Sequence, residues 1–261
     1  MRTYIELLKR ILNTGEIRDN RTGIDTLSKF GEFIEIDLRQ GFPILTTKKV
    51  NYMAAIGECL WMLSGDTNIA ALHKNNIHIW DSWADEKGNL GPVYGKQWRN
   101  FGGVDQIKEI ASEIMAHSNS RRIILNSWNV GELSEMQLPP CHVMAQFSVR
   151  DRFLDCAVFQ RSADAFLGLP FDIISYALMT SLFADMAGLQ PRKLVFFLGD
   201  VHIYANHIDQ CRMQVKRPTA NLPEISFPHV SNLDDILNLK ISDFEIKGYH
   251  PMPAIKGEVA I

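Results

Sequence analysis

Several features that would define a class of protein are missing from the sequence. Only four of its 261 residues are cysteine, and because these are widely spread with no CxxC pair, neither a disulfide framework nor a zinc ribbon is expected. Its 27 basic and 30 acidic side chains leave a formal net charge of −3, so no overall basic field favours binding to nucleic acid. It also lacks a glycine-rich phosphate loop, so any bound anion would have to be held by arginine.

Signals for export and for membranes are missing as well. No apolar run reaches the roughly 20 residues that cross a bilayer, and the first residues, MRTYIELLKRIL, are typical of a charged amphipathic helix rather than a signal peptide. The chain contains no internal repeat and no low-complexity tract. We therefore expect a soluble, cytoplasmic protein in which a hydrophobic content of 46% builds one core, with a single domain over residues 1–261.

Apolar periodicity predicts helices and strands that alternate irregularly, without a regular βαβ rhythm. This pattern favours the α+β class, built on one mixed or antiparallel sheet. Connecting loops are expected at residues 19–26, 41–49 and 84–98. Helices are predicted at residues 3–12, 52–63, 104–117 and 171–188, with short ones after residues 66 and 203; strands are predicted at residues 27–38, 121–128, 142–149, 153–160 and 239–246, and from residue 193.

Cys141, in the segment LPPCHVM, is the main candidate for a nucleophile. Two prolines fix the chain before it and an apolar strand follows, which places the thiol at a strand entrance. His142 comes directly after it. A cysteine can also be a small buried apolar side chain, but this setting favours the nucleophilic role.

Arginine side chains supply the fork-shaped donors that suit a phosphate group. Arg161 and Ser162 close one predicted strand, Arg121 and Arg122 open another, and Arg21 lies in the loop DNRTG. Each arginine could separately be an ordinary surface residue. Together they indicate an anion site.

Two apolar segments carry side chains that could face a ligand. Glu58 lies within YMAAIGECLWML, either at a solvated helix edge or as a buried carboxyl group with a raised pKa that could shuttle protons. Trp80 and Trp83 could belong to the core or stack on a flat heterocycle, and the same alternatives hold for Phe171.

The segment GDVHIYANH offers further polar groups. On a strand, His202 and Tyr204 would point to the same side, which suits hydrogen bonds to a sugar hydroxyl. A metal site that also includes His207 is the alternative, but no carboxylate or cysteine spacing supports it.

These motifs together resemble the thymidylate synthase family, of the folate-dependent type with a cysteine nucleophile. The resemblance covers the chain from end to end, and it implies one catalytic domain with an α+β fold. In that fold a large mixed sheet, flanked by helices, packs against a second copy in an obligate homodimer. The motifs that carry the resemblance are RTG at 21–23, GFPILTTKK, GECLWMLSGDTNI, IWDSWADE, GPVYGKQWR, SRRIIL, SWNVGEL, LPPCH, FQRSADAFLGLPF, GDVHIYANH and IKGEVAI.

The resemblance implies one-carbon transfer from 5,10-methylenetetrahydrofolate to C5 of a pyrimidine deoxynucleotide, with no metal, membrane or nucleic acid required. Cys141 would attack pyrimidine C6, which makes C5 nucleophilic. Arg121 and Arg122 would reach the phosphate of the nucleotide that is bound in the other subunit. The implied catalytic residues are Cys141, Glu58, His142, Tyr94 and Asp172; the implied substrate-binding residues are Arg21, Arg161, Ser162, Arg121, Arg122, Gln160, Asp164, Asp172, His202 and Tyr204; the implied folate-binding residues are Lys48, Ile79, Trp80, Trp83, Asp164, Leu167, Gly168, Phe171 and Ala260.

Asp172 departs from the family pattern, which is LPFN where this chain has LPFD. The family asparagine accepts a hydrogen bond from uracil N3–H and donates one to O4. An ionised aspartate only accepts, so it suits the amino group of cytosine, and the related deoxycytidylate hydroxymethylases carry aspartate here. Asp172 could instead simply favour the helix dipole in a first helical turn. We expect dCMP to be the favoured substrate; the alternative is an ordinary thymidylate synthase that methylates dUMP through a protonated Asp172.

The product is open between a methyl and a hydroxymethyl group. Trp80, His142 and the C-terminal residues 260–261 would shield the intermediate from water, which favours methylation. A catalytically weak relative that binds nucleotide or RNA is a third possibility, which the negative net charge and the intact Cys141–His142 pair disfavour.

Overall fold

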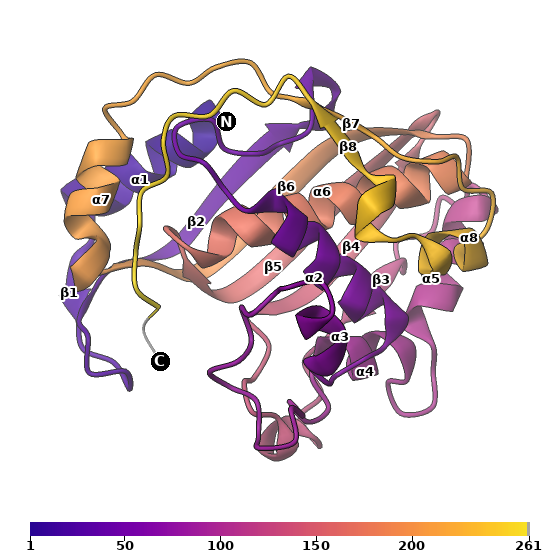
Figure 1. Ribbon diagram of the computed structural model, residues 1–261. Coiled ribbons are helices and arrows are strands. Elements are labelled where there is room, and N and C mark those ends of the chain that lie inside the picture. The colour runs from indigo at the N-terminus through magenta and orange to yellow at the C-terminus, as the bar shows by residue number, and fades with distance from the viewer. Residues whose placement is uncertain (260–261) are drawn as a thin grey trace.

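A six-stranded mixed sheet forms the centre of the molecule (Figure 1). The structure is a computed structural model that describes residues 1–259, so Ala260, expected in the folate site, lies outside the described residues. The strands of the sheet are β1 (Glu16–Arg18), β2 (Thr26–Asp37), β3 (Ile124–Asn126), β4 (His142–Arg150), β5 (Phe153–Asp164) and β6 (Gln190–Tyr204). Their order is β1-β2-β6-β5-β4-β3, and all neighbours are antiparallel except β5 and β6, which are parallel. The sheet, expected to be mixed or antiparallel, is mixed.

Helix α6 (Gly168–Met186) covers one face of the sheet and connects β5 to β6, because a parallel pair needs a crossover of this kind. Helix α2 (Tyr52–Ser64) packs against α6, so α6 is apolar on all sides and most of its side chains are buried (Figure 1). Among residues 1–259, no helix is both long enough and apolar enough to cross a membrane. The other helices are α1 (Arg2–Thr14), α3 (Ala70–His73), α4 (Tyr94–Arg99), α5 (Gln106–Met115), α7 (Ile208–Gln214) and α8 (Leu233–Asn238), with short 3-10 turns at Leu38–Gln40, Leu133–Glu135, Ala205–His207 and Ile241–Asp243.

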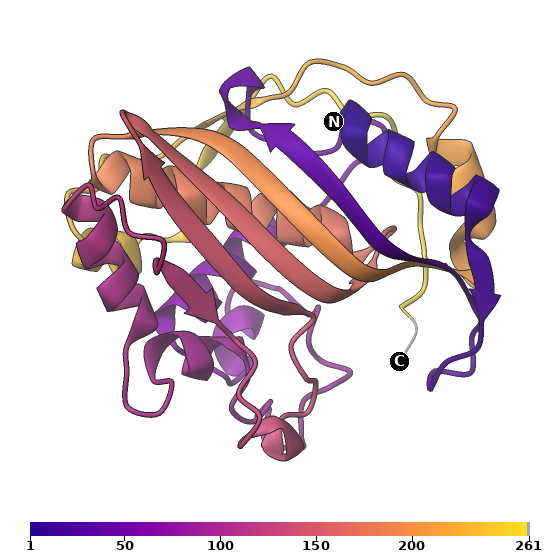
Figure 2. The same cartoon turned by 180° about the vertical axis from the view of Figure 1, so that it is seen from behind.

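The opposite face of the sheet has no helix across it in the part of the chain that the structure describes (Figure 2). Phe33, Phe197 and Phe159 are direct cross-strand neighbours on β2, β6 and β5. Their exposed fractions are 61%, 50% and 42%, respectively. We call these three side chains the phenylalanine row.

Two regions differ from the sequence-based expectation. The segment 84–98 was expected to be a loop, but its end forms the start of α4, because Tyr94 and Trp98 are buried against the core. The tail was expected to hold one strand at 239–246. These residues instead form a 3-10 turn (Ile241–Asp243), in which Asp243 accepts a hydrogen bond from the Lys240 amide. The strand β8 (Glu245–Lys247) follows this turn and pairs with β7 (Glu224–Ser226).

Helix α6 also begins earlier than expected, at Gly168 rather than Phe171. Asp164 Oδ1 accepts hydrogen bonds from the amides of Phe166 and Leu167, at 2.9 and 3.1 Å, and so organises the turn between β5 and the helix. Pro170 fits within the first helical turn, where a backbone N–H is not needed. As a result, Asp172 lies beyond the first turn, which contains no acidic residue.

The packing between α6 and the sheet predicts a large cost for truncating Phe183. This side chain is fully buried and meets Phe147 of β4 edge to face, with 5.5 Å between ring centroids. We expect Phe183→Ala to lower the free energy of unfolding by about 3–5 kcal/mol, measured by urea denaturation, because a large buried ring leaves a cavity. Val130→Ala, at an exposed position, is the control and should change it by less than about 0.5 kcal/mol. Equal changes in the two variants would contradict the assigned packing.

Candidate active site

Cys141 lies just before β4, where hydrogen bonds from two other elements hold the backbone. The Arg161 guanidinium, on β5, donates from Nε to the Pro140 carbonyl and from Nη2 to the Pro139 carbonyl, both at 2.8 Å. The Arg161 amide donates to the Cys141 carbonyl at 2.9 Å. From α4, the Tyr94 hydroxyl oxygen accepts the Cys141 amide at 2.7 Å. The predicted strand entrance is confirmed, and Arg161 restrains the diproline segment that leads to the thiol.

The Cys141 thiol is in surroundings that keep it protonated. Burial raises its pKa to about 11, the guanidinium groups of Arg161 and Arg21 act in the opposite direction, and the carboxyl groups of Asp172 and Asp164 add to the increase. The free thiol is therefore mostly protonated at neutral pH, and a ligand or base that changes these surroundings would favour the thiolate.

His142 is a neutral ring held in one orientation. Its imidazole stacks on the Tyr94 ring, with centroids 4.0 Å apart, and its Nδ1 lies 2.7 Å from the Tyr176 hydroxyl on α6. Burial lowers the pKa of His142 to about 3. Its Nε2 faces Asp172 Oδ1 at 3.8 Å, which is longer than a hydrogen bond. Sequence reasoning missed Tyr176, although its position four residues after Asp172 places both on one face of α6.

Asp172 pairs with Gln160 rather than with the start of its own helix. Gln160 Nε2, on β5, donates to Asp172 Oδ2 at 2.7 Å. Burial raises the pKa of Asp172 to about 7, the Gln160 hydrogen bond lowers it, and the Asp164 carboxyl raises it. Gln160 Oε1 is buried and has no partner among the described residues. The alternative assignment of Asp172 as a first-turn acid of the helix is wrong, because α6 starts four residues earlier.

Glu58 is a buried carboxyl group, and it does not lie at a solvated edge of its helix, which was the other alternative predicted for it. It is 9% exposed on α2 and accepts a hydrogen bond from Trp80 Nε1 at 2.7 Å. Burial raises the pKa of Glu58 to about 8, the Asp172 carboxyl adds to that increase, and the Trp80 hydrogen bond opposes it. Glu58 is therefore mostly protonated at neutral pH and can donate or accept a proton in an apolar setting.

The residues predicted to bind phosphate and sugar fall into two groups. The positive charge of Arg21 lowers the pKa of both Cys141 and Tyr204, and that of Arg161 also lowers the pKa of Cys141. By contrast, Arg121 and Arg122 are exposed, and Arg121 lines a hollow on the uncovered face of the sheet with side chains that include Gln146 and Lys193.

His202 and Tyr204 point to the same side of β6, as predicted, with ring centroids 5.0 Å apart. His202 Nδ1 lies 3.1 Å from Asp200 Oδ1. Among residues 1–259, the close group of possible metal ligands does not include His202 or His207. His207 instead has Nε2 at 2.8 Å from the Glu258 carbonyl, so it holds the C-terminal segment, a contact that sequence reasoning missed.

The predicted folate-binding residues include apolar side chains that suit a flat heterocycle. Trp80 is buried, with an exposed fraction of 6%, and meets Trp83 edge to face at 5.8 Å. Trp83 Nε1 is buried without a partner among the described residues. Among the predicted residues, Ile79, Trp83, Leu167 and Phe171 are partly buried and pack against the core, and Gly168 begins α6 directly after Leu167.

Lys48 and Asp164 have structural contacts of their own. The Lys48 ammonium donates to the Phe166 carbonyl and lies 3.5 Å from the centroid of the Phe166 ring. Burial lowers the pKa of Lys48 to about 8, while the Asp164 carboxyl opposes this shift. Both residues therefore stabilise the turn before α6, in addition to the ligand-binding roles predicted for them.

A comparison with protein families agrees with this geometry. The family model described as "Thymidylate synthase" matches residues 2–261. The chain therefore belongs to the thymidylate synthase family, and its mixed sheet flanked by helices is consistent with that fold. Membership makes the protein an enzyme of folate-dependent one-carbon transfer to C5 of a pyrimidine nucleotide, with methylenetetrahydrofolate as the co-substrate.

The hydrogen bond between Trp80 and Glu58 predicts a change in pH dependence. Trp80→Phe removes a donor that favours the ionised carboxyl group, so the pKa of Glu58 should rise further above its present value of about 8. In a plot of kcat against pH, the limb that depends on the ionisation of Glu58 should move to higher pH by roughly one unit.

Trp83→Phe is the matched control for this prediction, because Trp83 Nε1 has no partner among residues 1–259. In the pH profile of Trp83→Phe, the limb that depends on Glu58 should stay at the wild-type pH, even if the KM for folate changes. The assigned role of the Trp80–Glu58 bond fails if both variants move the limb equally or if neither moves it.

Proposed function

We propose that the enzyme transfers its one-carbon unit to dCMP in preference to dUMP, with Cys141 as the nucleophile and Asp172 as the residue that selects the base. The single observation that carries the choice of base is the carboxyl group of Asp172, held by Gln160 at 2.7 Å. Arg21, Arg161 and Ser162 would bind the phosphate, and His202 and Tyr204 the sugar. One catalytic domain would span residues 1–261.

Hydrogen-bond chemistry explains the preference. Gln160 occupies Asp172 Oδ2, which leaves Oδ1 for a ligand. An ionised carboxylate can only accept, so it attracts the N4 amino group of cytosine and repels O4 of uracil. A site built for one hydrogen-bonding group can reject the wrong partner by a factor of roughly 10⁴ or more.

The proposed chemistry begins at C6 of the pyrimidine. The Cys141 sulfur forms a bond to C6, the electron pair of the C5–C6 double bond moves toward the C4 substituent, and C5 becomes nucleophilic toward the folate methylene carbon. C5 forms a bond to that methylene carbon, and Glu58, Tyr94 and His142 would move protons at C4 and C5 as C5 loses its hydrogen as a proton. The bond from the methylene carbon to the folate nitrogen then breaks. Hydride from the resulting tetrahydrofolate gives a methyl group and dihydrofolate, whereas water gives a hydroxymethyl group and tetrahydrofolate, and the Cys141–C6 bond breaks to restore the C5–C6 double bond. The burial of Trp80 and His142 supports exclusion of water, and hence methylation.

A second candidate function has one observation in its favour. Because the pKa of Asp172 is raised to about 7, a fraction of the enzyme carries the neutral acid, which can donate to uracil O4. An ordinary dUMP methylase would use this form. Its dUMP activity would be greatest below pH 7 and would fall as the pH rises through the Asp172 pKa.

The choice of base can be tested by changing Asp172 to the amide. We expect wild type to release tritium faster from [5-³H]dCMP than from [5-³H]dUMP in the presence of methylenetetrahydrofolate. Asp172→Asn should reverse this order and change the ratio of kcat/KM values by roughly 10⁴, because an amide can donate to O4. Asp185→Asn, near the other end of α6, is the matched control and should leave the ratio unchanged. Faster turnover of dUMP by wild type at neutral pH would exclude the preference for dCMP and favour the second candidate.

We also infer that two chains form a homodimer through the uncovered face of the sheet. The phenylalanine row leaves large apolar surfaces exposed in a single chain, and such patches on soluble proteins mark interfaces. Arg121 lies at the same face, so a partner placed there would meet it. This supports Arg121 and Arg122 as contributors to the phosphate site of the other subunit.

A charge within the phenylalanine row should disrupt this dimer. We expect Phe197→Asp to sediment as a monomer and to lose most activity, because the interface would bury an unpaired carboxylate. Val104→Asp, at an apolar position with a similar exposed fraction (51% against 50%), should remain dimeric. A monomeric wild type, or a dimer that Phe197→Asp leaves intact, would rule out this interface.

The proposed chemistry requires a reduced thiol. All four cysteines are free, including Cys141. This supports a cytoplasmic location, where thiols are kept reduced.

A further inference from the structure

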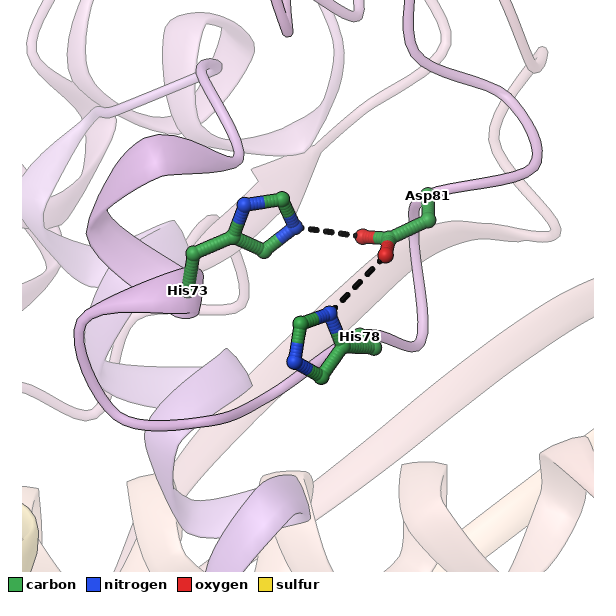
Figure 3. A group of neighbouring side chains, drawn as sticks. All are labelled: His73, His78 and Asp81. Carbon is green, nitrogen blue, oxygen red and sulfur yellow. Dashed lines mark hydrogen bonds and ion pairs between the residues drawn. The ribbon is translucent and has the colours of Figure 1, made fainter.

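Two histidines and one aspartate meet on the surface beside the segment that carries Trp80 (Figure 3). His73 Nε2 lies 2.7 Å from Asp81 Oδ1, and His78 Nδ1 lies 2.9 Å from Asp81 Oδ2. One ligand atom from each residue lies within 4.8 Å of the other two. Among residues 1–259, these three residues make up the one group of three or more His, Cys, Asp or Glu side chains arranged this closely.

We propose that His73, His78 and Asp81 bind a divalent transition-metal ion, with Zn²⁺ the best match. Two imidazole nitrogens and one carboxylate oxygen are common zinc ligands at roughly 2.0–2.2 Å, and water can complete a tetrahedral site. Imidazole also suits Ni²⁺ and Cu²⁺, whereas Mg²⁺ and Ca²⁺ prefer oxygen ligands. All three side chains are exposed, so small rotations can open the group around an ion.

The environment of His78 suits a positive charge, which either a second ring proton or a bound metal ion can supply. Its Nδ1 faces an Asp81 oxygen, and its Nε2 lies 3.3 Å from Asn76 Oδ1, so both ring nitrogens face oxygen atoms. A neutral imidazole has one N–H and satisfies only one of them. When Nε2–H donates to Asn76, the Nδ1 lone pair faces the carboxylate, and a metal ion between them removes that repulsion. A histidine ligand that donates its other N–H to a carbonyl oxygen is the usual arrangement at metal sites.

The backbone holds the two histidines together before any ion binds. Asn76 has a φ of 55°, in the left-handed region that asparagine tolerates, and its amide donates to the His73 carbonyl at 2.9 Å. The next residue, Ile77, is buried, and its amide donates to the Leu72 carbonyl. This turn brings the rings of His73 and His78 to 4.8 Å between centroids. The preformed turn lowers the entropic cost of gathering the ligands.

The site lies next to the proposed folate wall but is separate from the group around Cys141. Asp81 directly follows Trp80, and the Trp83 amide donates to the Trp80 carbonyl at 3.1 Å. An ion bound to Asp81 would restrain the backbone that carries both tryptophans. Tryptophan fluorescence is therefore a second readout of binding, independent of catalysis and of the base that the enzyme prefers.

The test is a calorimetric titration of the untagged, full-length protein with ZnCl₂ near neutral pH. We expect one strong site per chain, and we expect His73→Asn, His78→Asn and Asp81→Asn each to weaken binding by at least about tenfold. The three changed side chains are exposed, so thermal melting without metal should match wild type. Co²⁺ in place of Zn²⁺ should give a spectrum without a thiolate charge-transfer band.

His229→Asn provides the matched control, since His229 Nδ1 also lies 2.9 Å from the carboxylate of a partly buried aspartate, Asp185, but without a second histidine. It should bind Zn²⁺ as tightly as wild type. Cys141→Ser tests the other plausible zinc ligand and should keep the site. The proposal is overturned if the three variants bind like wild type, if only Cys141→Ser loses binding, or if wild type binds no Zn²⁺ at submillimolar concentration.

Discussion

Two neighbouring carboxyl groups, the buried Glu58 and the partly buried Asp172, are the interaction on which the rest of the site depends. Burial raises the pKa of Glu58 to about 8 and that of Asp172 to about 7, and the charge on Asp172 further disfavours ionisation of Glu58. Each acid has one side-chain donor, Trp80 for Glu58 and Gln160 for Asp172. Both acids therefore stay near their ionisation point at neutral pH, which suits proton transfer and base selection.

Helix α6 connects this chemistry to the fold. Its apolar circumference lets it pack between the sheet and α2. Asp172 faces Gln160 of β5, and Tyr176, one turn later, reaches His142 at the start of β4. Because the surrounding helix is buried, these polar side chains have few alternative partners. A protein without a rigid α6 would lose the pairing of Asp172 with Gln160 along with its core.

Much of the fold followed from local sequence patterns. The apolar stripes of α1 and α5 and the long apolar runs of α2 and α6 were recognised, and so were the central strands, because these segments are long and periodic. The start of α4 was missed, because the burial of Tyr94 and Trp98 depends on distant contacts. The tail was misassigned where the Asp243 side chain forms a turn at Lys240 and competes with strand formation.

By itself, the sequence determined the family, the cysteine at a strand entrance, the acid in place of an amide at position 172 and the arginines available for an anion. These depend on residue identity and near neighbours along the chain. The burial of Glu58, the pairing of Asp172 with Gln160 and the convergence of His73, His78 and Asp81 became visible in the folded chain alone. The protonation state and partner of a side chain depend on the surrounding dielectric and on groups distant in sequence, and the folded chain alone brings those groups together.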